Sequence, residues 1–250
     1  MNKLALARIA VLLVLVALLE IGCRSGLINN FDLIPPSQMV VALFELLRSG
    51  SLNGAIVRTV GAVAIAVVLA IVVGLLIAIA LHALPRLRRA IDPVLATYYS
   101  VPIFVFYPLF IVIFGLNDRP KVLIGFLLAV VTLIASTLNG FDRIPPVFRK
   151  TAKVMRLSRI EVVRDVILPC AAPHIFNGIK LAIAHAFVGV LAAEFILSTA
   201  GLGYRISYAF HDFNSREMYA VLLLILIIVT IVNSFLLGWE RRLRLRRGLV

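Results

Sequence analysis

Charged residues are scarce in this sequence, and acidic residues are the scarcest of them. Of the 250 residues, 15% are charged and 62% are hydrophobic, with 12 Asp and Glu against 25 Lys and Arg. Soluble domains carry about 25% charged and about 45–50% apolar residues. A soluble core could not enclose so much apolar surface, so the composition excludes an ordinary soluble domain and predicts a chain that sits in a lipid bilayer.

Residues that hold metals or phosphates are also few. His82, His174, His185 and His211 have no metal-ligand spacing with one another or with the two cysteines. The chain has no Gly-Lys-Ser/Thr loop of the kind that cradles phosphates. We therefore expect no metal and no cofactor, and we expect the energy for any work to come from a partner or an ion gradient.

The chain is rich in long, continuous apolar runs. About 20 apolar residues of helix cross the hydrocarbon and satisfy their own backbone hydrogen bonds, whereas barrel strands are shorter and alternate in polarity. The sequence therefore predicts an all-α fold, a polytopic membrane bundle of about six helices, and it shows no internal repeat. The expected spans are 4–22, 59–81, 93–116, 122–141, 181–203 and 218–239.

The first apolar run could also be a lipoprotein signal, because Lys3 and Arg8 begin it and Cys23 follows it. Glu20 stands where such a cleavage site needs an aliphatic residue. We therefore expect 4–22 to remain as a helix.

Lys and Arg gather at one set of span ends, and the side of the membrane that receives them is the cytoplasmic side. Both termini are therefore predicted to be cytoplasmic, and Cys23 and Cys170 lie on opposite sides, where they cannot pair. The net charge of +13 is then explained by span ends and anionic lipid, so we expect no nucleic-acid partner. The inner side holds 18 of the 25 Lys and Arg, and the outer side holds Arg24, Arg48, Arg58, Arg119, Lys121, Arg205 and Arg216.

The third span carries two prolines, Pro102 and Pro108. Each removes a backbone donor and is predicted to kink the helix, which frees carbonyl groups that need a partner or water. Tyr98, Ser100 and Tyr107 lie nearby, so the five residues are candidates for lining a transport pathway. Ordinary helix packing and interfacial aromatic residues would also explain them.

Glu194 is an acidic residue inside the apolar run 181–203. A carboxylate there costs ~2.5–3.5 kcal/mol on the lenient insertion scale, so it must face protein or water. It is a pathway candidate, but we favour a structural role as a hydrogen-bond acceptor, for example from the turn at 201–204.

The segment 143–180 is basic, contains several prolines and is less apolar than the rest of the chain. Helical spacing over 147–163 is broken near 156–158, the sequence at 166–169 is an apolar stop, and Pro173 begins a helix that enters the membrane. We expect two short cytoplasmic helices joined by a turn. At the opposite side, 39–47 is predicted to form an amphipathic helix on the outer surface.

The chain resembles the permease subunits of bacterial ATP-binding cassette importers, in the branch for nitrate, sulfonate, taurine and related small anions or heterocycles. The resemblance covers essentially the whole chain and depends on the order and spacing of several short motifs together. These are Leu33-Ile34-Pro35-Pro36-Ser37, Leu87-Arg88-Arg89, Asp92-Pro93, Pro102 with Pro108-Leu109-Phe110, Val166-Ile167-Leu168-Pro169, Ala193-Glu194 and Gly201-Leu202-Gly203-Tyr204.

In this family the inner loop carries Glu-Ala-Ala, three residues, Gly, nine residues and Ile-x-Leu-Pro, and it docks into a groove of the ATPase subunit. The resemblance places its second half at Leu168-Pro169, its glycine at Arg156 and its Glu-Ala-Ala at Lys150-Thr151-Ala152. Arginine supports a left-handed turn poorly, and the glutamate has become a lysine. Either the loop is adapted to an ATPase with a more acidic groove, which we favour, or coupling is weakened and a second, more regular permease works beside this one.

The resemblance implies a multi-pass protein of the bacterial inner membrane, with one permease domain over 1–250, a core over 52–240 and a cytoplasmic coupling loop over 142–180. It implies three partners: ATPase subunits that bind and hydrolyse ATP, an extracytoplasmic solute-binding protein and a second permease copy, expected as a homodimer. The protein itself would perform no catalysis. The alternatives are a gradient-driven secondary transporter or channel, and an integral-membrane enzyme, which would need clustered His, Asp or Glu.

Overall fold

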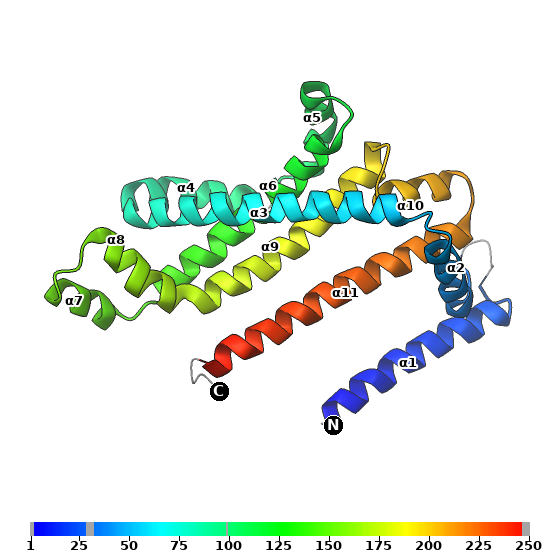
Figure 1. Cartoon of the computed structure of the whole chain (residues 1–250), viewed down its shortest axis with the longest axis horizontal. Helices are drawn as coiled ribbons and strands as arrows, with labels where there is room; N and C mark the ends of the chain where they lie inside the picture. The colour runs from blue at the N-terminus through cyan, green and yellow to red at the C-terminus, as the bar shows by residue number, and fades with distance from the viewer. Residues whose placement is uncertain (1–2, 29–32, 99, 247–250) are drawn as a thin grey trace.

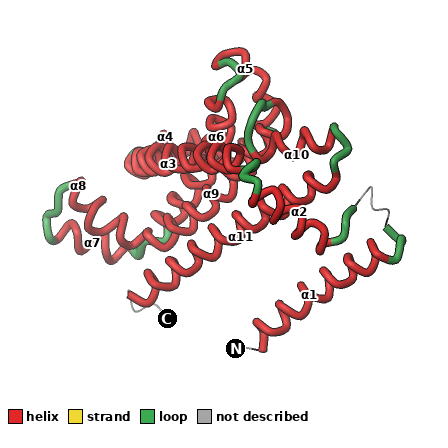
Figure 2. Tube along the Cα trace, turned by 45° about the vertical axis from the view of Figure 1, so that its right-hand side comes forward, coloured by secondary structure: helices red, strands yellow, loops and turns green. Residues whose placement is uncertain are grey.

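The computed structural model describes residues 3–28, 33–98 and 100–246, and all regular structure in these ranges is helical (Figures 1 and 2). The predicted all-α fold is confirmed. The helices are α1 (Lys3–Arg24), α2 (Pro36–Arg48), α3 (Asn53–Ala83), α4 (Pro85–Tyr98), η1 (Ile103–Phe106), α5 (Tyr107–Phe114), α6 (Asp118–Asp142), α7 (Pro146–Val154), α8 (Arg159–Glu161), η2 (Val162–Ile167), α9 (Leu168–Leu197), α10 (Leu202–His211) and α11 (Ser215–Arg246).

Three long helices, α3, α6 and α9, pack together and form the core of the bundle. Their contact faces are lined with small residues, among them Ala66, Ala129 and Ala186, which are all 0% exposed. Small side chains allow helix backbones to approach closely in a membrane, where association depends on packing rather than on a hydrophobic driving force. The closest approach joins α6 to α9, where a Cβ on Gly189 would lie 2.8 Å from the Cα of Gly125.

The remaining long helices lie around this core. α11 contacts α10 and α2, and it meets α9 through an ion pair of 2.6 Å between Lys180 and Glu240. At the other end of α11, Arg216 pairs with Glu45 of α2 at 2.8 Å. α1 touches the rest of the chain through α2 and runs in the same general direction as α11, apart from the core (Figures 1 and 2).

Within the described residues, four helical stretches are long and apolar enough to span a membrane, or five if one bent pair is a single span. The four are α3, α6, the stretch 162–211 that contains α9, and the first 26 residues of α11. α1 occupies the first expected run, 4–22, and the count of six remains a prediction.

The third expected span, 93–116, was wrong in where it starts, but the break predicted near Pro102 is present, and that its two parts form one span remains a prediction. α4 begins earlier, at Pro85, and a bend of 88° separates it from the η1 and α5 pair. Pro102, with φ −73° and ψ 88°, precedes η1 and cannot donate to a preceding turn. Pro108 lies in the first turn of α5, where a missing N–H costs nothing.

The expected stop at 166–169 and the new helix at Pro173 were also wrong. The π turn η2 runs directly into α9, and Pro173 lies inside that helix. Pro169 is in the first turn of α9, where the backbone N–H has no helical partner to lose, so the proline is tolerated. The segment between α6 and the core part of α9 is therefore α7, a turn, and a helical path that continues into the core.

The glycine contact between α6 and α9 gives a test of this packing. Gly189→Ala forces a methyl group against the backbone of Gly125, so we expect a lower melting temperature of the purified protein in detergent, corresponding to about 1–3 kcal/mol of overpacking. Gly61→Ala in α3 is the matched control, because nothing lies within 4 Å of its added Cβ. Equal effects of the two substitutions would contradict the close α6–α9 crossing.

Candidate functional site

The segment that joins α6 to α9 exposes an unusual mixture of apolar and basic side chains. Val154, Met155 and Ile160 are 84%, 65% and 80% exposed. Lys150 and Arg156 are exposed beside them in the sequence. We call these five residues the coupling surface. Apolar side chains this exposed, on a segment outside the long apolar helices, are typical of a protein interaction site.

The turn that ends α7 contains a left-handed arginine. Arg156 has φ +53°, its N–H donates to the carbonyl of Lys153 at 3.1 Å, and the N–H of Leu157 donates to the carbonyl of Ala152 at 3.1 Å. This is a Schellman motif, which normally has glycine at the left-handed position. An L-residue there costs about 1–2 kcal/mol. The chain therefore keeps the backbone geometry of a glycine turn although the side chain is arginine.

A capping box fixes the residues that follow. The N–H of Ser158 donates to the carboxylate of Glu161 at 2.7 Å, and the N–H of Glu161 donates to the Ser158 hydroxyl at 3.3 Å. Hydrogen bonding from the Ser158 side chain, and next from its backbone N–H, holds the pKa of Glu161 below its ordinary value. The carboxylate thus stays ionised, and the cap stays formed, until the pH falls below the ordinary range of a glutamate.

The coupling surface is firmly connected to the core. Ile144 and Ile167, before and after it in the chain, are both buried in the cluster formed by α3, α6 and α9. Arg88 of α4 makes a bidentate ion pair with Asp142 at the end of α6, with distances of 2.7 and 2.5 Å. α7 packs against η2, which continues into α9. A displacement of α7 would therefore be transmitted to α4, α6 and α9.

The six residues predicted to contact the ATPase differ in how exposed they are. Lys150, Thr151 and Arg156 are exposed, and the Thr151 hydroxyl donates to the carbonyl of Val147 at 3.1 Å. Ala152 is 2% exposed and anchors α7 instead. Leu168 and Pro169 form the first turn of α9, with Leu168 half-buried against the core and Pro169 exposed.

At the opposite end of the core, Glu194 is the centre of a buried polar cluster. Its carboxylate is 0% exposed and accepts hydrogen bonds from the Thr59 hydroxyl at 2.7 Å, the Lys121 ammonium at 3.0 Å and the Gly203 N–H at 3.1 Å. Lys121 is 1% exposed and also pairs with Asp118 at 2.8 Å. The cluster therefore joins α3, α6, α9 and the start of α10.

The turn between α9 and α10 is shaped around this carboxylate. Gly201 has φ +116°, and a Cβ on it would lie 2.1 Å from the Glu194 carboxyl group. The N–H of Leu202 donates to the Thr59 hydroxyl at 2.8 Å. The turn 201–204 is thus held on Glu194 by hydrogen bonds from both sides, as expected for a structural acceptor, and the pathway role of Glu194 stays a prediction.

The structure brings only some of the other pathway candidates together. Tyr98 and Tyr107 pack around one small apolar cluster, where the Tyr98 hydroxyl donates to the carbonyl of Leu127 at 3.0 Å and Tyr107 is 2% exposed. Ser100, Pro102 and Pro108 are exposed and do not join them.

Two residues of the polar cluster were missed from the sequence. Thr59 was placed only as the start of a span, and Lys121 only as an outer cation. One signal was available, because a buried carboxylate needs a cation and Lys121 adjoins a span end on the same side of the membrane. Nothing in the sequence distinguished it from Arg58, Arg119 or Arg205.

A helical membrane core, an interaction surface attached to it at one end and a buried polar cluster at the other define a transport protein of the membrane. Residues 70–247 match the model of the family described as "binding-protein-dependent transport system inner membrane component". The chain belongs to this family, whose members are transport components and not enzymes. It is the permease subunit of an importer of the ATP-binding cassette class, and the gradient-driven alternative is set aside.

Two relatives resemble the chain over most of its length. It is 28% identical to the aliphatic sulfonates transport permease protein SsuC of Bacillus subtilis (strain 168), over 92% of this chain and 83% of that protein. It is 28% identical to the taurine transport system permease protein TauC of Escherichia coli (strain K12), over 87% and 81%. Its fold is similar to that of an inward-facing MetNI methionine ABC transporter, with a TM-score of 0.67, 20% identity and coverage of 75% and 94%.

The buried ion pair gives a sharp stability test. Lys121→Met leaves the buried Glu194 carboxylate without a cation, so it is expected to lower the free energy of unfolding by about 3–5 kcal/mol, measured by thermal unfolding in detergent. Glu194→Gln leaves Lys121 paired with Asp118, so it is expected to cost less. The double substitution is expected to cost clearly less than the sum of the single ones. Arg119→Gln, on the same turn of α6 but exposed, is the control and is expected to change little. Additive losses would show that the two charges act independently.

The left-handed arginine gives a second test. Arg156→Gly removes the steric cost at φ +53° and is expected to stabilise the turn by about 1 kcal/mol, seen as slower amide hydrogen exchange over 146–161. Arg156→Ala removes the same charge but keeps a Cβ, so it is expected to give no such gain. If both substitutions slowed exchange equally, the cost would come from the charge and not from the backbone.

Proposed function

We propose that this chain forms the translocation pathway for a small organic or inorganic oxyanion, and that its coupling surface is where cytoplasmic ATPase subunits dock. The cargo class follows from the relatives named for aliphatic sulfonates and taurine. The docking role rests on one observation, the exposed apolar side chains of Val154, Met155 and Ile160 on a segment joined rigidly to the core.

The same geometry supports an orientation. Lys180 lies in the half of α9 that follows η2, and Glu240 lies near the end of α11, so their ion pair places the C-terminal part of α11 towards the coupling end of the bundle. α1 runs away from α2, which is at the opposite end of α11 (Figure 1). Both observations favour termini on the cytoplasmic side, together with the coupling surface and the excess of Lys and Arg.

In the proposed mechanism, two permease copies enclose a central pathway and a solute-binding protein delivers cargo at the end that carries α2 and α10. ATP binding draws the two coupling surfaces together, and the connections of α7 to α4, α6 and α9 convert this movement into opening of the pathway on the outer side. Hydrolysis of ATP in the partner subunits resets the permease. The domain assignment remains 1–250, with a core over 52–240 and a coupling loop over 142–180.

The positive charge of the coupling surface predicts an acidic groove in the ATPase. Lys150 and Arg156 are exposed and unlike the acidic and glycine residues that the family motif has at these positions. Arg156 keeps the left-handed turn in spite of its cost, so the backbone of the docking turn is preserved while its charge is changed. We therefore favour a partner groove that is more acidic than usual over a loss of coupling.

This idea is tested in the complex reconstituted with its own ATPase and binding protein. Arg156→Gly combined with Lys150→Glu restores the residue types of the family motif, and we expect cargo-stimulated ATP hydrolysis to fall about fivefold or more, since charge reversal opposes an acidic groove. Arg156→Gly alone is the control, because it relaxes the turn and leaves Lys150 in place. An increase in coupled hydrolysis in the double variant would contradict the acidic groove and favour weakened coupling.

A further inference from the structure

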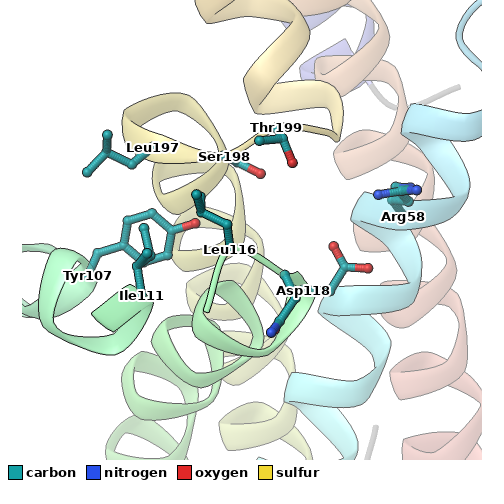
Figure 3. A pocket seen from close by; sticks show the side chains of 9 residues that line it. Arg58, Tyr107, Ile111, Leu116, Asp118, Leu197, Ser198 and Thr199 are labelled. Carbon is teal, nitrogen blue, oxygen red and sulfur yellow. The ribbon is translucent and has the colours of Figure 1, made fainter. Parts of the chain in front are cut away.

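A cavity of about 190 Å³ lies beside the polar cluster, between α3, α5, the start of α6 and the end of α9 (Figure 3). Arg58 lies on one side of it and Tyr107 on the other, and Asp118, Ser198 and Thr199 complete its polar lining. A water molecule occupies about 30 Å³ in the liquid, so the cavity has room for a small anion with some of its water.

The charged groups around this cavity, Arg58, Lys121, Asp118 and Glu194, sum to zero, but both carboxylates are bonded to Lys121. Lys121 is bonded to both Asp118 and Glu194, and Glu194 is further saturated by Thr59 and Gly203. Among the residues that the structure describes, none supplies a carboxylate within ion-pair distance of Arg58. Among these residues Arg58 therefore has no direct ion-pair partner, although the Asp118 carboxylate lines the same cavity.

The hydroxyl groups of Ser198 and Thr199 differ in whether the protein already supplies a hydrogen-bond partner. The Ser198 hydroxyl donates to the carbonyl of Ala200 at 2.9 Å, so it is already used within the turn. Thr199 has no hydrogen bond from its hydroxyl to any described residue, and this group faces the space between Ser198 and Arg58 (Figure 3). A ligand that accepts hydrogen bonds from a guanidinium and a hydroxyl at once fits this pair.

We propose that the cavity is an oxyanion-binding site of the permease, with Arg58 as its cation and Thr199 as a second donor. The proposal deepens the proposed function and rests on it for the identity of the anion. A planar guanidinium makes paired, charge-assisted hydrogen bonds to sulfonate, phosphate or carboxylate oxygens. Arg58 and Thr199 are both exposed, so an anion can reach them from solution.

The position of the site connects it to the rest of the core. Arg58 directly precedes Thr59, and Ser198 and Thr199 directly precede the turn at 201–204. The Thr59 hydroxyl donates to Glu194 and accepts from the N–H of Leu202 in that turn. An anion held by Arg58 and Thr199 would therefore bridge α3 and the end of α9, at a point where both are fixed to α6.

Two sources can supply the oxyanion: imported cargo, or the headgroup phosphate of a lipid. The two sources are distinguished by which of them protects Arg58 from a guanidine-directed reagent. The extent of modification at Arg58 is measured by mass spectrometry in the complete complex. The probe anions are taurine and methanesulfonate, added to the complex in lipid-free detergent. In the second arm, nanodiscs of phosphatidylglycerol are compared with nanodiscs of phosphatidylcholine without added probe.

We expect the probe anions to slow modification of Arg58 at least fivefold and to leave Arg119, an exposed arginine outside the cavity, unchanged. Uptake of the probe at saturating binding protein is expected to fall about tenfold in Arg58→Gln and to be unchanged in Arg119→Gln. Because the binding protein sets the apparent affinity for the probe, we expect Arg58→Gln to lower the maximal rate of uptake.

The outcomes are distinct. Protection by phosphatidylglycerol with none by the probe anions supports the site and assigns it to a lipid headgroup. Equal protection of Arg58 and Arg119, or no protection in either arm, overturns the site. Failure of the wild-type complex to take up any oxyanion contradicts the proposed function instead, and the modification assay still reports on the cavity.

Discussion

The buried ion pair between Lys121 and Glu194 is the constraint on which one end of the bundle depends. Both side chains are essentially without contact with solvent, at 1% and 0% exposure. The Glu194 carboxylate could not be left without Lys121 in the membrane, because an isolated buried charge is far more costly than a paired one. Their partners come from three long helices and a turn, so satisfying two charges also fixes the relative positions of α3, α6 and α9.

The coupling end of the bundle is held together by different interactions. There the helices are joined by apolar anchors on each side of the segment and by a bidentate ion pair between Arg88 and Asp142. The turn between them keeps a left-handed residue where glycine would be unstrained, and a capping box follows it. A rigid segment with an exposed apolar surface is suited to transmit force from a partner, because little of the displacement is lost in local bending.

The sequence predicted much of the fold because the bilayer imposes strong rules. Long apolar runs located α3, α6, α9 and α11, and the basic segment located the coupling surface. The breaks were harder to predict. Pro102 separates two helices, whereas Pro169 and Pro173 are accommodated within a continuous helical path. The consequence of a proline depends on whether its missing N–H lies in a first turn or beside a widened turn, and neighbouring helices decide that.

The sequence by itself determined that the chain is a helical membrane protein, which segment projects from it and which residues depart from the family motif. Those properties follow from composition and spacing along the chain. Only the tertiary structure decided that Thr59, Lys121 and Glu194 form one cluster and that, among the described residues, Arg58 has no carboxylate within ion-pair distance. Such pairings join residues 73 and 135 positions apart, and they depend on how helices are packed rather than on any local pattern.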